Sequence, residues 1–214
     1  ASTELLAQMK EGDAILDLVG PLGQKSHIAS GLGTVVCIGG GIGVAPVYPI
    51  TRGMKEAGNR VISIIGAKSQ DILIMEKEMR AASDETLVTT DDGSYGIKGF
   101  VTTALKELLT RGERIDLVYA IGPVVMMKSV ADVTRPLGIK TIVSLNPIMV
   151  DGTGMCGGCR VQVGGETKFA CVDGPEFDGA IVDFAGLQAR QGMYREMEAR
   201  AREHVCRIGL GGNA

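Results

Sequence analysis

The chain of 214 residues contains no tryptophan, four phenylalanines, four tyrosines and two histidines. It lacks basic runs and the aromatic motifs of RNA-binding modules, and its formal net charge is −3, so we expect no nucleic-acid partner. No apolar run is long enough to span a bilayer, which argues against a membrane partner. The 45% apolar content and 31 glycines instead suit one or two compact α/β domains.

Cysteine is also scarce, with five in the chain, but three of them fall within one motif. The motif reads Asp151-x4-Cys156-x2-Cys159-x11-Cys171. Plant-type [2Fe–2S] sites space their four ligands as C-x4-C-x2-C…C, and here an aspartate takes the first position. The spacing predicts a [2Fe–2S] cluster in a protein of the reducing cytoplasm rather than a framework of disulfides.

The segment from 160 to 170 explains how the last cysteine would return to the others. Two short alternating runs flank a pair of glycines, a pattern typical of a β-hairpin with a two-residue turn. Pairing Val163 with Glu166 across this turn would place Cys171 one rung from Cys159. The hairpin is therefore expected to bring the fourth ligand to the other three.

Four glycines between residues 152 and 158 would let the backbone wrap an inorganic core and direct N–H groups at its sulfurs. Two alternatives stay open. A C-x-x-C pair also occurs in zinc sites, where the fourth ligand would be Asp151, Cys206, His27 or His204. Asp151 also precedes a glycine, and an ordinary turn residue would explain it too.

From residue 31 to about 148, short apolar runs alternate with amphipathic segments. The expected strands are Thr34–Ile38, Arg60–Ile65, Thr86–Thr90, Asp116–Ile121 and Lys140–Leu145. The expected helices lie near residues 43–57, 70–81, 98–110 and 123–134. This alternation predicts an α/β fold with a five-stranded, doubly wound parallel sheet. Cys37, inside the first strand, is expected to be a buried core thiol.

Ligands bind such sheets at the carboxyl ends of the strands. Glycine, polar and proline turns follow all five expected strands: Gly39-Gly40-Gly41-Ile42-Gly43, Gly66-Ala67-Lys68, Asp91-Asp92-Gly93, Gly122-Pro123 and Asn146-Pro147. The cluster loop begins just after the fifth strand, at the same edge. A bound ligand and the cluster should therefore be neighbours.

The turn Gly39–Gly43 opens the first helix, where bare backbone and a helix N-terminus suit a pyrophosphate. A structural tight turn would explain the same glycines, but the strand order and the adjacent cluster motif favour binding of NAD(P). Asp91-Asp92-Gly93 would line the nicotinamide–ribose pocket or form a solvated loop. Lys68 would pair with a 2′-phosphate or lie free on the surface, so the sequence does not distinguish NADH from NADPH.

These motifs together resemble the ferredoxin–NADP reductase superfamily, and among its members the electron-transfer subunits of the dihydroorotate dehydrogenase B type. The resemblance extends over nearly the whole chain. Two departures from that type are Asp151 in place of a first cysteine and Ile121 before Gly122-Pro123. Both are similar to the small (alpha) subunit of NADH-dependent ferredoxin:NADP oxidoreductase, also described as sulfide dehydrogenase, in which an aspartate joins three cysteines.

The resemblance implies an NAD(P)-dependent flavin/iron–sulfur oxidoreductase subunit without a catalytic nucleophile or acid–base pair. It implies FAD, held mainly by an N-terminal barrel domain. About the first third of a typical family member, including most of that domain, is absent here. Residues 3–6 would be a flavin-contacting helix and residues 13–19 the last barrel strand. The expected domains are the barrel remnant 1–30, the NAD(P)-binding domain 31–148, the cluster-binding subdomain 149–181, and the terminal helix and tail 182–214.

The partner implied is a larger flavin-containing subunit, glutamate synthase-like or dihydroorotate dehydrogenase-like, with ferredoxin as a further partner. The fragment alone would turn over poorly. An amphipathic helix is expected from Leu187 to His204, packed on its own domain or docking the larger subunit. The alternatives are an electron-transfer subunit of dihydroorotate dehydrogenase B or of a hydrogenase, and a zinc-stabilised nucleotide-binding module without catalysis.

Overall fold

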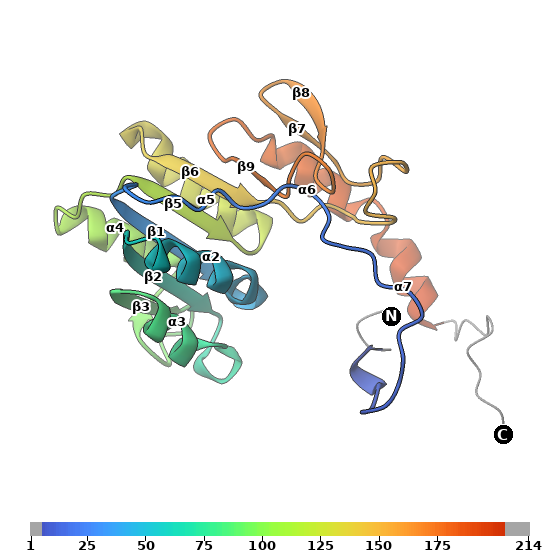
Figure 1. Ribbon diagram of the computed structural model, residues 1–214, viewed down its shortest axis with the longest axis horizontal. Helices are drawn as coiled ribbons and strands as arrows, with labels where there is room; N and C mark the ends of the chain where they lie inside the picture. Colours follow the sequence, from blue (N-terminus) through green and yellow to red (C-terminus); the bar gives the residue numbers. More distant parts are fainter. Residues whose placement is uncertain (1–5, 204–214) are drawn as a thin grey trace.

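The computed structural model describes residues 6–203, which build a central seven-stranded sheet with the order β4-β3-β2-β1-β5-β6-β9 (Figure 1). The parallel strands are β1 (Thr34–Gly40), β2 (Arg60–Ala67), β3 (Glu85–Thr90), β4 (Ile97–Lys98), β5 (Leu117–Ile121) and β6 (Lys140–Ser144). At one edge, β9 (Glu176–Asp178) runs antiparallel to β6. The predicted α/β fold and its five parallel strands are confirmed. The sheet also gains two short edge strands, β4 and β9.

Helices cover both faces of the sheet. They are α2 (Val44–Glu56), α3 (Glu76–Ala82), α4 (Val101–Thr110), α5 (Val124–Thr134), α6 (Phe184–Gly192) and α7 (Arg195–Glu203), with short 3-10 turns η1 (Gly41–Gly43), η2 (Gln70–Ile72) and η3 (Arg135–Leu137). Every residue of β1 is buried, as expected of a central parallel strand covered on both faces. Alternate β1 side chains pack in two separate hydrophobic clusters, one with α2 and α3 and the other with α4 and α5.

Cys37 is fully buried in the α2 cluster. Burial raises the pKa of its thiol to about 12, because a thiolate there would lose its hydration. The prediction of a buried core thiol is therefore confirmed.

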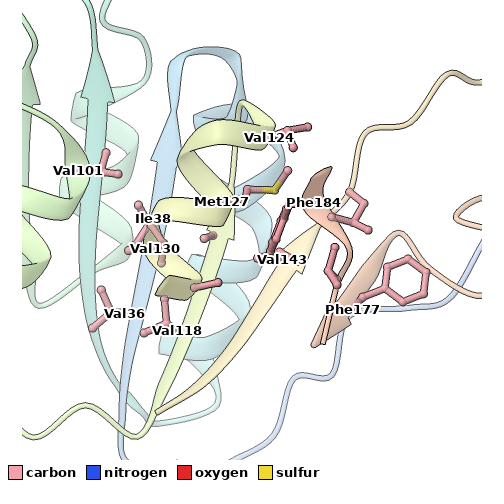
Figure 2. Packing of buried hydrophobic residues seen from close by; sticks show 14 of the residues in the cluster. Val36, Ile38, Val101, Val118, Val124, Met127, Val130, Val143, Phe177 and Phe184 are labelled. Atoms are coloured by element: carbon pink, nitrogen blue, oxygen red, sulfur yellow. The ribbon is translucent and has the colours of Figure 1, made fainter. Parts of the chain in front are cut away.

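The hydrophobic cluster on the α4 and α5 face continues past the edge of the sheet. Figure 2 shows this packing, in which Val143 of β6, Phe177 of β9 and Phe184 of α6 belong to one core. Cys159 and Cys171 belong to the same core. The segment that carries the cysteine motif is therefore packed on the sheet rather than joined to it by a free linker.

The predicted hairpin is present as β7 (Arg160–Val163) and β8 (Glu166–Phe169), at the β6–β9 end of the molecule (Figure 1). Val163 pairs with Glu166, the predicted register. The turn glycines have φ values of 60° and 82°, the two successive positive values that a type I′ turn requires. Val161 and Val163 turn inward while their neighbours are exposed, so alternation fixes which face meets the core.

Three segments differ from the predicted pattern. The helix expected at 70–81 is divided into η2 and α3, with Met75 between them at φ 56°. The helix expected from 98 begins at Val101, because Lys98 pairs in β4 and Gly99 has φ 128°. The predicted terminal helix is two helices, α6 and α7, and residues 204–214 lie outside the described part of the chain.

The N-terminal segment reaches β1 as an extended chain (Figure 1). Residues 13–19, which the resemblance assigns to a barrel strand, form no strand here, and the Leu16 and Leu18 side chains are 95% and 91% exposed. The helix expected at residues 3–6 falls almost entirely outside the described residues. Within residues 6–203, no helix is long and apolar enough to cross a membrane.

Candidate nucleotide cleft and cluster loop

A cavity of about 690 Å³ opens at the carboxyl ends of β1, β2 and β3, and the first turns of α4 and α5 complete its walls. Six of the residues predicted to bind the cofactor line it: Gly40, Gly41, Gly66, Lys68, Asp91 and Pro123. The other six lie on the same turns without lining it: Gly39, Ile42, Gly43, Asp92, Gly93 and Gly122. The cleft lies where strand connections pass to opposite faces of the sheet, the usual binding position in doubly wound folds.

The glycine turn after β1 serves two structural purposes. A Cβ on Gly43 would lie 2.2 Å from the Ile121 carbonyl oxygen, and one on Gly39 would lie 2.8 Å from Val44 Cα. These two glycines therefore let α2 approach the sheet. Gly41 differs, because it has φ 55° and open space where a Cβ would lie. Its bare backbone faces the cavity, as the phosphate-loop interpretation requires.

Several apolar residues of the cavity were not predicted from the sequence. The Ile72 and Phe100 side chains are 50% and 66% exposed, and Val125 and Met126 line the cavity from α5. Large exposed apolar groups along a cleft suit a flat aromatic ring system. Phe100 lies just before α4, and its exposure follows from the later start of that helix. The sequence signal was an aromatic residue next to a strand-end glycine, Gly99.

The loop after β3 is a tightly bonded turn. Asp91 and Asp92 donate their N–H groups to Ala67 and Lys68 carbonyls, which ties the loop to the end of β2. The Asp92 carboxylate accepts from the N–H and the hydroxyl of Ser94 at 2.9 and 2.7 Å. These bonds lower the pKa of Asp92. Asp92 therefore matches the structural-turn alternative. Asp91 lines the cavity together with Lys68, the one basic residue of the lining within residues 6–203.

The cysteine motif lies on the loop after β6 and on the hairpin. Cys159 and Cys171 are buried with their Sγ atoms 3.2 Å apart. The Ala170 N–H donates to the Cys159 carbonyl at 3.2 Å, which continues the predicted hairpin pairing. Burial, with the Cys159 thiol alongside, raises the pKa of Cys171. Cys156 is exposed, and its Sγ accepts from the Gly158 N–H at 3.3 Å.

Asp151 organises the start of this loop. Its two carboxylate oxygens accept the N–H groups of Thr153 and Cys156, both at 2.9 Å. The hydrogen bond from the Thr153 N–H is the largest of the effects that lower the pKa of Asp151. The group is therefore a carboxylate at neutral pH. The turn role considered for Asp151 is therefore present. Each oxygen keeps a second lone pair, which leaves capacity for a metal bond.

The donor set fits an iron–sulfur cluster by its chemistry: three thiols and a carboxylate on a loop with positive φ at Gly152, Gly154 and Gly157. The structure brings Cys159 and Cys171 together. Among the described residues, no three acidic, histidine or cysteine side chains form a ready-made metal site. Two of the zinc alternatives, Cys206 and His204, lie outside those residues.

Comparison with known proteins agrees with both halves of the site. Residues 146–183 match the iron-sulfur cluster binding domain of dihydroorotate dehydrogenase B, and residues 37–132 match the oxidoreductase NAD-binding domain. A solved structure described as an NADH-dependent reduced ferredoxin-NADP oxidoreductase, studied for flavin-based electron bifurcation, has a chain with a TM-score of 0.87 and 51% identity. That match covers 95% of this chain and 72% of the other.

Two curated relatives are named after the electron transfer subunit of dihydroorotate dehydrogenase B, one of them as a homologue. A Thermotoga maritima homologue of the dihydroorotate dehydrogenase B (NAD(+)) electron transfer subunit is 52% identical over 197 residues, covering 92% of this chain and 69% of that protein. The Geobacillus thermodenitrificans electron transfer subunit is 37% identical over 180 residues, covering 82% of this chain and 67% of the relative. The chain belongs to the family of dihydroorotate dehydrogenase B electron-transfer subunits and their homologues.

Proposed function

We propose that this chain is the electron-transfer subunit of an NAD(P)-dependent flavin/iron–sulfur oxidoreductase. The observation that carries the proposal is the joint position of the two sites. The dinucleotide-sized cleft opens at the carboxyl ends of the parallel strands, and the cysteine loop starts directly after β6 ends at the same edge. Because Cys159 and Cys171 share a core with the sheet, the cleft and the cysteine loop keep fixed positions relative to each other.

In the cleft, the backbone of Gly40 and Gly41 and the start of α2 would receive the pyrophosphate. Lys68 and Asp91 would contact a ribose and its substituents, and the apolar lining would hold a base. Gly122-Pro123 would border the nicotinamide side. In the loop, Asp151, Cys156, Cys159 and Cys171 would hold the [2Fe–2S] cluster, which supplies one-electron transfer when bound.

A flavin is required between the two sites, because a nicotinamide exchanges electrons in pairs and a [2Fe–2S] cluster takes them singly. We propose that FAD is bound outside the described residues and that the chain turns over poorly without it. The partner would be a larger catalytic subunit, either dihydroorotate dehydrogenase-like or glutamate synthase-like, with ferredoxin as a further partner.

Two forms of the assembly remain as candidates. The name of the Thermotoga relative and the cluster-domain family model support a dihydroorotate dehydrogenase B complex. The second form is a complex like the NADH-dependent reduced ferredoxin-NADP oxidoreductase. Two observations support it: Asp151 in the first ligand position, and the 51% identity to a chain of that structure. We favour the second, because the aspartate occupies a position that bears directly on the cluster.

Nucleotide affinity tests the cleft assignment. Lys68 lines the cavity, whereas Lys77 is exposed on α3 away from it. Reversing the charge in Lys68→Glu should weaken binding of NADH or NADPH about tenfold, or about 1.4 kcal/mol, when measured by titration calorimetry. Lys77→Glu should bind as the wild type does. Equal affinities for all three proteins would contradict the assignment, and a larger loss for NADPH than for NADH would identify a 2′-phosphate contact.

A further inference from the structure

The last turn of α6 contacts the cysteine loop through one side chain that the cluster motif does not contain. Arg190 Nη2 donates to the Gly158 carbonyl at 3.2 Å. Gly158 lies between Cys156 and Cys159, and its N–H donates to Cys156 Sγ. The guanidinium is therefore bonded to the peptide group that joins Gly158 to Cys159, one of the proposed ligands. Residue 190 also lies outside residues 146–183, which match the cluster-domain family model.

The same turn also holds the beginning of the loop. Gln191 Nε2 donates to the Asn146 carbonyl at 2.7 Å, two residues after β6 ends at Ser144. Arg190 and Gln191 thus fasten the loop at both ends, near Asn146 and at Gly158. Since Phe184 and Leu187 anchor α6 in the core, this clamp is fixed to the rest of the fold.

The Arg190 guanidinium is partly buried and incompletely satisfied. Its Nε atom is buried and has no hydrogen-bond partner among the described residues. Among residues 6–200, whose side chains the structure describes, no carboxylate forms a salt bridge with it. An unpaired, partly desolvated cation is costly, and its cost falls when negative charge is placed nearby.

A [2Fe–2S] cluster on three thiolates and a carboxylate is an anion, and it gains a further negative charge when reduced. A neighbouring cation stabilises the reduced form more than the oxidised form. This preference is strongest where solvent screening is weak. Arg160 offers a contrast in the same loop, because its Nη1 donates to the Gly157 carbonyl at 3.1 Å but its side chain is exposed.

We propose that Arg190 is a positioning residue that sets the reduction potential of the cluster. It fixes the Gly158 carbonyl between two ligands, and its charge favours the reduced state. The inference rests on the proposed function, since it requires a cluster at Asp151, Cys156, Cys159 and Cys171.

Redox titration of anaerobically reconstituted protein, followed by EPR, tests this role. Arg190→Gln should lower the equilibrium constant for cluster reduction about tenfold, which is about 59 mV for one electron. Arg160→Gln, the matched exposed cation, should change it less than about threefold. Arg190→Lys retains the charge and should stay within about threefold of the wild type.

The outcomes separate the two claims. A wild-type protein that assembles no [2Fe–2S] cluster overturns the cluster assignment and this inference together. An intact cluster with the same potential in Arg190→Gln and wild type overturns the inference alone. If Arg190→Gln does not fold, a tenfold fall in Arg190→Lys would contradict the role of the charge, and a potential near that of the wild type would support it.

Discussion

Gly43 ends the short turn between β1 and α2, where a side chain would collide with the Ile121 carbonyl oxygen. Gly43→Ala should therefore lower the free energy of unfolding by about 1–3 kcal/mol, as overpacking does, in a urea titration. Gly192→Ala provides the control, because Gly192 is helical and has open space around it. That variant should gain about 0.5–1 kcal/mol. Equal stability of Gly43→Ala and wild type would show that α2 can move away without cost.

Glu176 is a second single residue with a testable effect, because it makes the free energy of unfolding depend on pH. Burial raises the pKa of its carboxyl above the ordinary 4.5, while the Ser26 hydroxyl that donates to it acts in the opposite direction. Between pH 4.5 and the native pKa, the Glu176 carboxyl is therefore protonated in the native state and mostly ionised in the unfolded chain. As pH rises from 4.5 through the native pKa, this group's contribution to stability falls. Glu176→Gln should flatten the fall in the free energy of unfolding over that interval.

A matched variant isolates the burial effect at Glu176. Glu107 is exposed on α4, and Glu107→Gln removes a carboxylate from the surface instead. Its stability should follow the wild-type pH profile. A wild-type slope in Glu176→Gln would refute the buried-proton explanation.

The β7–β8 hairpin determines where Cys171 lies relative to Cys159. A one-residue slip in an antiparallel pair moves every side chain to the opposite face. One glycine inserted between Gly164 and Gly165 should therefore separate the two thiols and reduce iron incorporation about tenfold, as measured by metal analysis and visible absorbance. Gly165→Asn, which tolerates positive φ, should keep its iron. Full incorporation in the insertion variant would mean that the loop alone positions the ligands.

Elements with enough sequence of their own could be predicted. Each of the five predicted parallel strands contains a short apolar run, and the hairpin has a two-residue turn that fixes its register. β4 and β9 have two and three residues, too few for a pattern, and they form only because a sheet edge is available. The start of α4 depended on backbone angles at Gly99 that a helical periodicity does not reveal.

The site was predictable to the same degree. Strand-end turns indicated six residues that line the cavity, and cysteine spacing indicated two thiols that lie together, because both signals are short local motifs. The apolar walls around Phe100 and Met126 were missed, since they arise from packing between α4 and α5. Arg190 was missed for the same reason: its link to Gly158 joins residues that are 32 positions apart.

At the scale of the whole molecule, the candidate cleft and the cysteine loop pack against the same hydrophobic cluster, the one that α4 and α5 cover. The central claim is that the loop holds a [2Fe–2S] cluster that receives electrons originating from the nucleotide. EPR spectroscopy of the anaerobically reconstituted, dithionite-reduced chain, combined with iron, sulfide and zinc analysis, tests this claim most directly. We predict two iron and two sulfide per chain and the signal of a single unpaired electron. A colourless, EPR-silent protein that contains zinc would contradict it.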